Sequence, residues 1–518
     1  MYLLNDPDFG QIVDFDLIRS NMKKTYDLMH PHFNMLGVAK SGSDLYDKNP
    51  SYLIAGGAST LAYSMLLAAE EYELAEELKP YLFTLGWTEE AVGSDLLSAT
   101  TTATPDPSDP SGKTYHIKGK KWLINNSYHA DYHMVVAKID PNQNGPRSLS
   151  LFVVPRTSTN NWKRLETHVL QNMVLTTFDV DGPGRLVGKV GHGLSILQRM
   201  AMPSKYICTY VGVEMLEEAL KASLAHLSSK HIFGNEPIRF SNVFRQMYGL
   251  ALKGAFYNFF FHRAVVFSDS SFLSFHGTLL KSFLLLRINE ALSENLLVAG
   301  SKGFLRESVI GRNAIDSFVL PVFDGHYTIN TLMSAKHIDR YLAATRSENM
   351  SARIDTLREK LFVEEIGNQI NAKPSDIRHP DFFDVQDYWQ QLQVPLDLDM
   401  GKLLDAVRTL VNEVEARQLD SEAEYKYKVG VLSHWLEAVV ASGEFWKVMA
   451  DDVYLNAIVQ TYNGLVNTFN AIISEGALTT DFLQPMRFLP IPEFDKAEDF
   501  LSRLLNIQER LGKFQAVR

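Results

Sequence analysis

Two segments in the first quarter of the chain constrain its fold more than any others. The first, Leu85 to Asp95, has the pattern of a strand that runs into a tight turn. The second, Ile117 to Asn126, has the pattern of a strand that closes a hairpin, because the stretch before it, Pro105 to Gly112, supplies turn residues. Glycine and hydroxyl side chains in the first turn allow a ligand to approach the backbone closely. The two segments therefore predict a β-domain with a polar turn that can hold a ligand.

The composition limits the classes of protein to which this chain can belong. Its 518 residues correspond to about three to four domains, and a hydrophobic content of 46% is sufficient for sizeable cores. The net charge of −11 argues against a nucleic-acid-binding protein, which needs a basic face, but it allows a local basic pocket for an anionic ligand. Cys208 is the only cysteine, so the chain can form neither an intramolecular disulfide nor a thiolate metal cluster.

We expect a cytoplasmic protein without a transmembrane segment, a nucleic-acid partner or a metal. Residues Met1 to Asp8 lack the basic and apolar regions of a signal peptide. The most apolar run, Phe256 to Phe267, is interrupted by polar and charged residues. No metal-ligand spacing surrounds the histidines His129, His133 and His192.

Changes in the hydrophobic period divide the chain into four regions. We predict a helical region over residues 1–84, a β-domain over residues 85–193, a helical bundle over residues 194–347 and a further helical region over residues 348–518. The helical period predicts individual helices over Leu53–Leu78, Asn242–Phe267, Leu279–Ala299, Leu403–Ala416, Lys428–Val448 and Val453–Ile473. Short β-branched runs predict strands over His133–Ile139 and Ser148–Val154. The predicted fold class is mostly α with a central β-domain.

This order of regions, together with the residues of three motifs, resembles the acyl-CoA dehydrogenase superfamily. The turn Thr-Glu-Glu-Ala-Val-Gly-Ser-Asp, residues 88–95, is similar to the superfamily's Thr-Glu-x-x-x-Gly-Ser-Asp, and Gly-Lys-Lys-Trp, residues 119–122, follows at the matching distance. The resemblance covers residues 54–340. It implies an N-terminal helical domain, a middle β-barrel and a C-terminal four-helix bundle, with FAD as the cofactor. Residues 348–518 have no specific counterpart in the resemblance, although some long-chain members also carry an extra helical domain there.

The β-domain motifs imply one side of a flavin site. The implied contacts of the strand and turn are Trp87, Thr88, Gly93 and Ser94. Asn125 stands where the superfamily usually has a threonine near the reactive flavin nitrogen, so it is a further implied contact. Leu123 replaces a tryptophan that is frequent beside the flavin ring.

Two motifs in the bundle imply the other side of that site. Lys230-His231-Ile232-Phe233-Gly234 resembles the superfamily's Arg-x-x-Phe-Gly, whose basic residue reaches the flavin pyrophosphate of a neighbouring subunit. Lys230 and Phe233 are therefore implied cofactor contacts, and a homodimer or homotetramer is implied. Ala299 to Phe304 resembles Phe-Gly-Gly-x-Gly-Phe/Tyr, in which Ser301 replaces a glycine close to the cofactor.

The resemblance also implies a catalytic base. Asp324 lies 20 residues after Phe304 and aligns without a gap with the glutamate of the superfamily's Tyr-Glu-Gly-Thr. His326 takes the place of the threonine in that motif and is a further implied cofactor contact. Oxidation of an acyl thioester needs a carboxylate that removes the α-proton and a flavin that accepts the β-hydride. The implied function is FAD-dependent α,β-dehydrogenation of a thioester of coenzyme A or of a carrier protein, with electrons passed to an electron-transfer acceptor.

Other interpretations fit the same residues. Residues 88–95 are compatible with an ordinary strand-to-turn connection, Lys230 with a solvated charge, and Asp324-Gly325 with a common turn. The replaced cofactor contacts also fit a non-catalytic subunit or binding protein that kept the fold. A flavin-dependent monooxygenase on the same scaffold would need no base for an acyl α-proton, because its reduced flavin reacts with oxygen.

Overall fold

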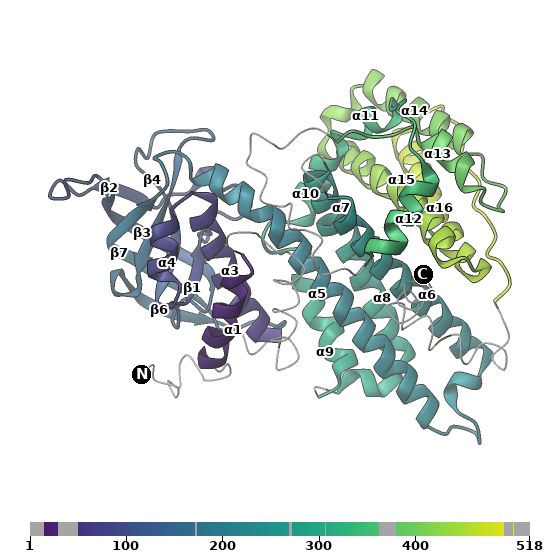
Figure 1. Ribbon diagram of the computed structural model, residues 1–518, viewed down its shortest axis with the longest axis horizontal. Helices are drawn as coiled ribbons and strands as arrows, with labels where there is room; N and C mark the ends of the chain where they lie inside the picture. Colours follow the sequence, from purple (N-terminus) through teal and green to yellow (C-terminus); the bar gives the residue numbers. More distant parts are fainter. Residues whose placement is uncertain are drawn as a thin grey trace. The chain divides into compact units, whose positions relative to one another are not determined.

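Two units make up the chain in the computed structural model, which describes residues 15–29, 50–170, 174–268, 272–305, 307–361, 380–491 and 501. The first unit comprises residues 1–207 and the second comprises residues 208–518. The division falls inside the long helix α5 (Gly193–Ser229) (Figure 1). The four regions expected from the sequence remain a prediction of the domain boundaries.

Helices precede the strands in the first unit: α1 (Phe15–Asp27), α3 (Pro50–Ala68) and α4 (Tyr72–Leu78). The residues of α3 are almost all apolar or small, and this helix packs on α1, where the rings of Tyr26 and Tyr63 stack with their centroids 4.1 Å apart. The sequence predicted one helix over Leu53–Leu78, but α3 and α4 are separated by a turn in which Glu70 has a φ of 62°. A residue in the left-handed region ends a helix because it cannot continue the right-handed hydrogen-bond pattern. The prediction of a single helix was therefore wrong.

Seven strands form the β-domain that the two N-terminal segments predict. They are β1 (Phe83–Gly86), β2 (Thr102–Pro105), β3 (Thr114–Asn125), β4 (Tyr132–Lys138), β5 (Leu149–Pro155), β6 (Thr159–Leu165) and β7 (Leu175–Val187). The pairings run β4-β2-β3-β7-β5, and β5 pairs again with β4, so the sheet closes into a small barrel. Two of these strands, β4 and β5, confirm the strands predicted from β-branched runs, each shifted by one residue.

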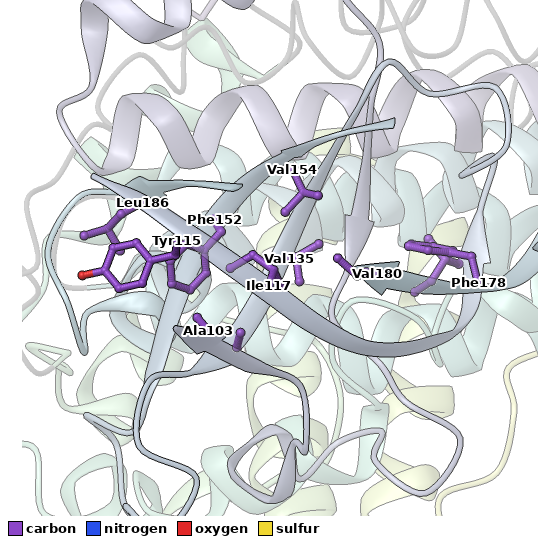
Figure 2. Packing of buried hydrophobic residues seen from close by; sticks show 11 residues of the cluster. Ala103, Tyr115, Ile117, Val135, Phe152, Val154, Phe178, Val180 and Leu186 are labelled. Carbon is purple, nitrogen blue, oxygen red and sulfur yellow. The ribbon is translucent and has the colours of Figure 1, made fainter. Parts of the chain in front are cut away.

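The interior of the barrel is filled by side chains that alternate along its strands. Figure 2 shows residues of β3, β4, β5 and β7 converging on one another, among them Ile117, Val135, Phe152, Val154 and Phe178. Alternate side chains of a strand point to the same face, so each strand contributes several residues to this core. Complete burial of a side chain of this kind contributes about 1.5–3 kcal/mol. The core fixes β3, the strand that carries the Gly-Lys-Lys-Trp segment.

The described part of the second unit consists of helices and their connections. Its bundle contains the end of α5, then α6 (Ser241–Val266), α7 (Leu273–Leu279), α8 (Leu285–Val298), α9 (Val309–Asp316), α10 (Tyr327–Ala335) and α11 (Ile338–Leu342). A π-helical turn, Leu280–Leu284, joins α7 to α8 without a break. The C-terminal helices are α12 (Met350–Lys360), α13 (Val385–Leu392), α14 (Met400–Ala416), α15 (Ala423–Met449) and α16 (Leu455–Gly476). The predicted helices over Asn242–Phe267, Leu403–Ala416, Lys428–Val448 and Val453–Ile473 correspond to α6, α14, α15 and α16.

A buried ion cluster joins the C-terminal helices to the bundle. Arg263 of α6 pairs with Glu437 at 2.7 Å and also with Glu444, both on α15. Arg353 of α12 pairs with Glu444 at 2.6 Å, and two tyrosine hydroxyls donate further hydrogen bonds to these carboxylates. Burial raises the pKa of Glu444, but the two arginines outweigh burial and lower the pKa to about 2. The cluster thus connects α6, α12 and α15 through full charges.

Candidate functional site

The first predicted motif lies where β1 ends beside β3. Past the end of β1 the backbone continues to pair with β3, because the Trp122 N–H donates to the Thr88 carbonyl at 3.0 Å. The Thr88 hydroxyl donates to the Trp122 carbonyl at 2.6 Å. Glu89 and Val92 then exchange two backbone hydrogen bonds and close a tight turn. The proton of the Thr88 hydroxyl is therefore used inside the protein, and its oxygen remains available as an acceptor.

Glu89 holds this turn in place, although the sequence analysis gave it no role. Its buried carboxylate accepts hydrogen bonds from the amide and hydroxyl groups of Thr100 and Thr101 at 2.5–3.0 Å and pairs with Lys121 Nζ at 3.1 Å. Burial raises the pKa of Glu89, but Lys121 and the threonine donors outweigh burial and lower the pKa to about 2. Burial also lowers the pKa of Lys121 to about 8, against the opposing effect of Glu89. At neutral pH the pair is therefore ionised.

Four buried polar atoms at the ends of β1 and β3 have no hydrogen-bond partner within the described residues. They are Trp87 Nε1, Asn125 Oδ1, Asn126 Oδ1 and Asn126 Nδ2. Asn125 itself is fixed, because its carbonyl accepts from the Thr84 hydroxyl and its Nδ2 donates to the Ile54 carbonyl at 2.9 Å. An unsatisfied buried polar atom costs about 1–3 kcal/mol. Unsatisfied buried atoms of this kind are groups that a hydrogen-bonding ligand can satisfy.

Gly93 and Ser94 lie on the exposed side of the same turn. A Cβ added to Gly93 would meet no atom within 4 Å, so packing inside this unit does not require the glycine. Leu123, which replaces the expected tryptophan, has a φ of 58° and is also exposed. The turn at Gly93 and Ser94 therefore has open space at the positions where the motif implies a ligand.

The two predicted cofactor motifs of the second unit lie near one histidine, His226. Burial lowers the pKa of His226, and the ammonium groups of Lys230 and Lys302 lower it further. Lys230 directly follows α5, whereas Lys302 belongs to the short helical turn Gly300–Phe304. Two basic side chains from separate motifs thus act on the same place, which favours an anionic group there.

The remaining residues of these two motifs lie at exposed turns. Phe233 has a φ of 50° and is 93% exposed, so it is not a core residue of the described chain. Ser301 is exposed as well. The close backbone approach near it depends on another glycine, because a Cβ added to Gly311 would lie 2.0 Å from the Gly303 carbonyl oxygen. Ser301 therefore occupies a position where the fold tolerates a side chain.

Asp324 lies in a tight turn between Leu320 and α10. Asp324 and Gly325 have φ values of 53° and 102°, and the Tyr327 N–H donates to the Pro321 carbonyl at 2.9 Å across the turn. His326 caps α10, since its Nδ1 accepts from the Thr328 N–H at 3.2 Å. Aspartate tolerates the left-handed region better than most residues, and the glycine after it supplies the second positive φ. The turn presents a half-buried carboxylate at the position of the predicted base.

Lys281 supports this turn, and the sequence analysis did not identify it. It is fully buried on the π-helical turn, donates to the Leu320 carbonyl, and places Nζ 4.6 Å from the centre of the Phe323 ring. A π-turn inserts one residue into a helix and often occurs at functional sites. A lysine inside an apolar helical stretch, Leu279 to Leu286, was the sequence signal that could have revealed this residue.

The structure groups the predicted site residues within each unit. In the first unit, Trp87, Thr88, Gly93 and Ser94 lie at the end of β1 and in the turn after it, whereas Asn125 lies at the end of β3 and contacts Thr84 of β1. In the second unit, Lys230 and the Ser301 turn lie near His226, and Asp324 and His326 share another turn. Among the described residues no group of His, Cys, Asp and Glu side chains is placed to hold a metal ion, and no described helix is both long and apolar enough to cross a bilayer.

Comparison with known proteins shows which family the sequence around the first motif resembles. Residues 84–175, which contain the first motif and most of the strands, match the family model of the acyl-CoA dehydrogenase middle domain. Over 299 residues the chain is 27% identical to 3-methylmercaptopropionyl-CoA dehydrogenase of Ruegeria pomeroyi, covering 49% of each chain. Residues 84–175 therefore form an acyl-CoA dehydrogenase middle domain. The chain is also 29% identical over 166 residues to the acyl-CoA dehydrogenase-like protein AidB of Escherichia coli (strain K12), covering 30% of this chain and 29% of AidB. It thus spans about half or less of the length of these curated relatives.

Solved structures share the fold of this chain. The FAD-complexed acyl-CoA dehydrogenase of Bacillus anthracis aligns with a TM-score of 0.67 and 18% identity over 96% of this chain and 90% of that chain. Butyryl-CoA dehydrogenase of Megasphaera elsdenii aligns with a TM-score of 0.56 and 16% identity over 64% of this chain and 91% of that chain. At these identities the likeness concerns the fold alone. It confirms the predicted fold class, a mostly helical chain with a central small β-barrel.

Proposed function

We propose that this protein binds FAD and dehydrogenates an acyl thioester between its α and β carbons. The observation that carries the proposal is the match of residues 84–175 to the acyl-CoA dehydrogenase middle domain, because this segment contains the Thr88 turn and the unpartnered polar atoms Trp87 Nε1, Asn125 Oδ1, Asn126 Oδ1 and Asn126 Nδ2. Such atoms are costly unless a ligand satisfies them. The matching segment supports a flavin as that ligand.

The residues of both units fit parts of FAD. The edge of a flavin ring offers both hydrogen-bond donors and acceptors. Trp87 offers an indole N–H, Asn125 an amide oxygen, and Asn126 an amide oxygen and an NH₂ group. The open space beside Gly93 leaves room for a ligand at the turn. In the second unit, Lys230 and Lys302 supply the positive charge that a pyrophosphate requires.

Asp324 is the proposed catalytic base. Its carboxylate would take a proton from the α carbon of the thioester, and the Asp324 N–H would donate to the thioester oxygen as negative charge develops there. When bound, FAD supplies the acceptor for the hydride that leaves the β carbon. Phe323 and Tyr327 flank the acid and would exclude water from it. Lys281 would act as a positioning residue, because it holds the turn on which Asp324 lies.

Several features of the proposed enzyme follow from its superfamily. The substrate would be a thioester of coenzyme A or of a carrier protein, as in fatty acid metabolism, and the electrons would pass to an electron-transfer acceptor. Lys230 and Phe233 would contact the cofactor of a neighbouring subunit in a homodimer or homotetramer. A cytoplasmic location is compatible with all of these roles.

An absorbance spectrum and a reduction assay test the proposal together. Purified protein supplied with FAD should show a flavin band at roughly 450 nm, and anaerobic addition of a suitable thioester should bleach it. Asp324→Asn should bind FAD as tightly as the wild type but bleach about 10²- to 10⁴-fold more slowly, which is the usual contribution of a general base. Asp339→Asn, an exposed aspartate on α11, is the matched control and should behave as the wild type.

Two outcomes would replace the proposal. A protein that remains colourless after incubation with FAD would be the non-catalytic binding protein or subunit that the replaced contacts also fit. A flavoprotein in which Asp324→Asn stays fully active would not use this acid, and that result would favour the monooxygenase.

A further inference from the structure

Three asparagines of α16 bind the main chain of the segment that follows this helix. Asn470 binds Leu483, Asn463 binds Met486, and Asn456 binds Leu489. In every pair the side-chain NH₂ group donates to the backbone carbonyl, at 2.9–3.3 Å, and the side-chain oxygen accepts from the backbone N–H of the same residue, at 2.8–2.9 Å. Each asparagine therefore satisfies both polar groups of one residue. We call these three asparagines the asparagine ladder, and residues 481–491 the strap.

The spacing of the ladder matches the spacing of an extended chain. The asparagines lie seven residues apart, which is about 10.5 Å along an α-helix. Their partners lie three residues apart in the strap, which is about 9.3 Å in a polyproline II helix. The helix and the strap run in opposite directions, because Asn456 binds the last partner and Asn470 binds the first. The two periods agree closely enough for a repeated contact along the helix.

Burial in the strap has the same period of three. Leu483, Met486 and Leu489 are half-buried against the helix, whereas the residues between them are exposed. Phe482 and Phe488 are 54% and 60% exposed, so the largest side chains of the strap do not anchor it. The strap lacks regular secondary structure of its own. The contacts that place its backbone are therefore those of the ladder, together with the Tyr462 hydroxyl, which donates to the Gln484 carbonyl at 3.3 Å.

We propose that the asparagine ladder is a peptide-binding site that reads the main chain of an extended polypeptide, and that the strap occupies it as an intramolecular ligand. The ligand class is an extended peptide with a non-proline apolar residue at every third position, because these residues must supply an N–H to the ladder. Positions between them accept proline, as Pro485 and Pro490 show. Main-chain hydrogen bonds supply affinity in such complexes, and periodic side chains supply selectivity. An extended peptide of another chain with this pattern would displace the strap.

A labelled peptide tests the proposal on the full-length protein. The probe is a fluorescent peptide of residues 479–491, and binding is followed by fluorescence anisotropy. A strap-release variant carries Leu483→Pro, Met486→Pro and Leu489→Pro, because proline keeps the extended backbone but removes the N–H groups that the ladder requires. We expect saturable binding to this variant and at least tenfold weaker apparent binding to the wild type, whose own strap competes at high effective concentration.

Substitutions in the ladder provide the decisive comparison. In the strap-release background, Asn463→Ala with Asn470→Ala should weaken peptide binding at least tenfold. Asn467→Ala, an exposed asparagine on the same helix, should leave it unchanged. A peptide with Phe482→Ala and Phe488→Ala should bind within about threefold of the original, whereas a peptide with Met486→Pro should bind at least tenfold more weakly. Peptide binding that the ladder substitutions leave unchanged, or that the loss of the two phenylalanines weakens strongly, would overturn the proposal.

Hydrogen exchange tests the proposal on the wild type, without the strap-release variant. In the wild type, a saturating excess of unlabelled peptide should speed exchange of the strap amides at Leu483, Met486 and Leu489 at least tenfold, because displacement exposes them to water. Asn463→Ala should produce the same acceleration at Met486 without peptide. Unchanged exchange of the strap in both experiments would show that it is a fixed part of the fold and that the ladder is not an exchangeable binding site.

Discussion

The Thr88 turn and the Asp324 turn carry the two halves of the proposed chemistry, but they are held in different ways. The Thr88 turn rests on the buried pair of Glu89 and Lys121 and on backbone pairing with β3. The Asp324 turn has two consecutive residues with positive φ, the hydrogen bond from the Tyr327 N–H to the Pro321 carbonyl, a hydrogen bond from Asn330 Nδ2 to the Gly325 carbonyl, and the buried Lys281. The first turn therefore contains a buried pair of opposite charges, whereas positive-φ backbone and hydrogen bonds support the second.

This difference predicts how each turn fails. Removing one charge from a buried pair leaves the other charge uncompensated, so the Thr88 turn is sensitive to single substitutions and to acid. At the Asp324 turn, the buried Lys281 contacts a carbonyl and an aromatic ring. The Asp324 turn should be destabilised more by substitutions that change the shape of a side chain than by substitutions that remove a charge.

Lys121→Met should give the largest effect on stability. The substitution leaves the Glu89 carboxylate buried without its cation, which typically costs about 3–5 kcal/mol. Urea unfolding monitored by tryptophan fluorescence measures the loss. The adjacent exposed lysine provides the control, because Lys120→Met should change the free energy of unfolding by less than about 0.5 kcal/mol. If the double variant Glu89→Gln/Lys121→Met were as unstable as Lys121→Met, the unpaired charge would not be the cause.

Acid should weaken the Thr88 turn next most strongly. The folded pKa of Glu89, about 2, lies below the value of about 4.3 expected for an unfolded chain, so folding favours the ionised form. This contribution is complete above the unfolded pKa and is lost as the pH falls toward 2; two units correspond to about 3 kcal/mol. Unfolding free energies measured between pH 5 and pH 2.5 should fall less steeply for Glu89→Gln than for the wild type. Identical slopes would mean that other carboxylates cause the acid sensitivity.

Lys281→Met should have the smallest effect on stability, about 1–2 kcal/mol, because methionine fills the space but loses the hydrogen bond to the Leu320 carbonyl. Its effect on catalysis should be larger, since misplacing the Asp324 turn by about 1 Å can cost about 10²-fold in rate. Thioester-dependent flavin bleaching should slow while FAD binding stays unchanged. The exposed Lys336→Met is the control. A normal bleaching rate in Lys281→Met would show that the turn holds its shape without the lysine.

The sequence predicted most of the fold because its signals are local. Periodicity located α6, α14, α15 and α16, and β-branched runs located β4 and β5. It did not locate the break between α3 and α4, which lies in a turn where Glu70 adopts the left-handed conformation. It also placed the start of the helix at Leu279 instead of Leu273, because the π-turn disturbs the helical period over Leu280–Leu284.

The candidate site was predicted less completely, since several of its supports depend on contacts between distant segments. Motif spacing located the Thr88 and Asp324 turns, whose roles stay predictions. Glu89 and Lys121 are 32 residues apart, and only the folded barrel brings them together. The burial of Lys121 could have been predicted, because it lies four residues after the buried Ile117 on β3 and alternate residues of a strand point to the same face. The sequence gives no such indication for Asn126, because its unsatisfied amide is apparent only from the packing around it.

The ion cluster centred on Arg263 has a consequence for the history of this chain. Glu437 and Glu444 neutralise an arginine that is itself buried in α6 of the bundle. A gene shortened before α12 would remove both counter-ions together with the helix that covers Arg263, so the guanidinium would be solvated. The same loss would expose Phe256 and Phe259 of α6, whose rings pack against Phe445 of α15. A relative that ends after the bundle should therefore carry polar residues at these two positions.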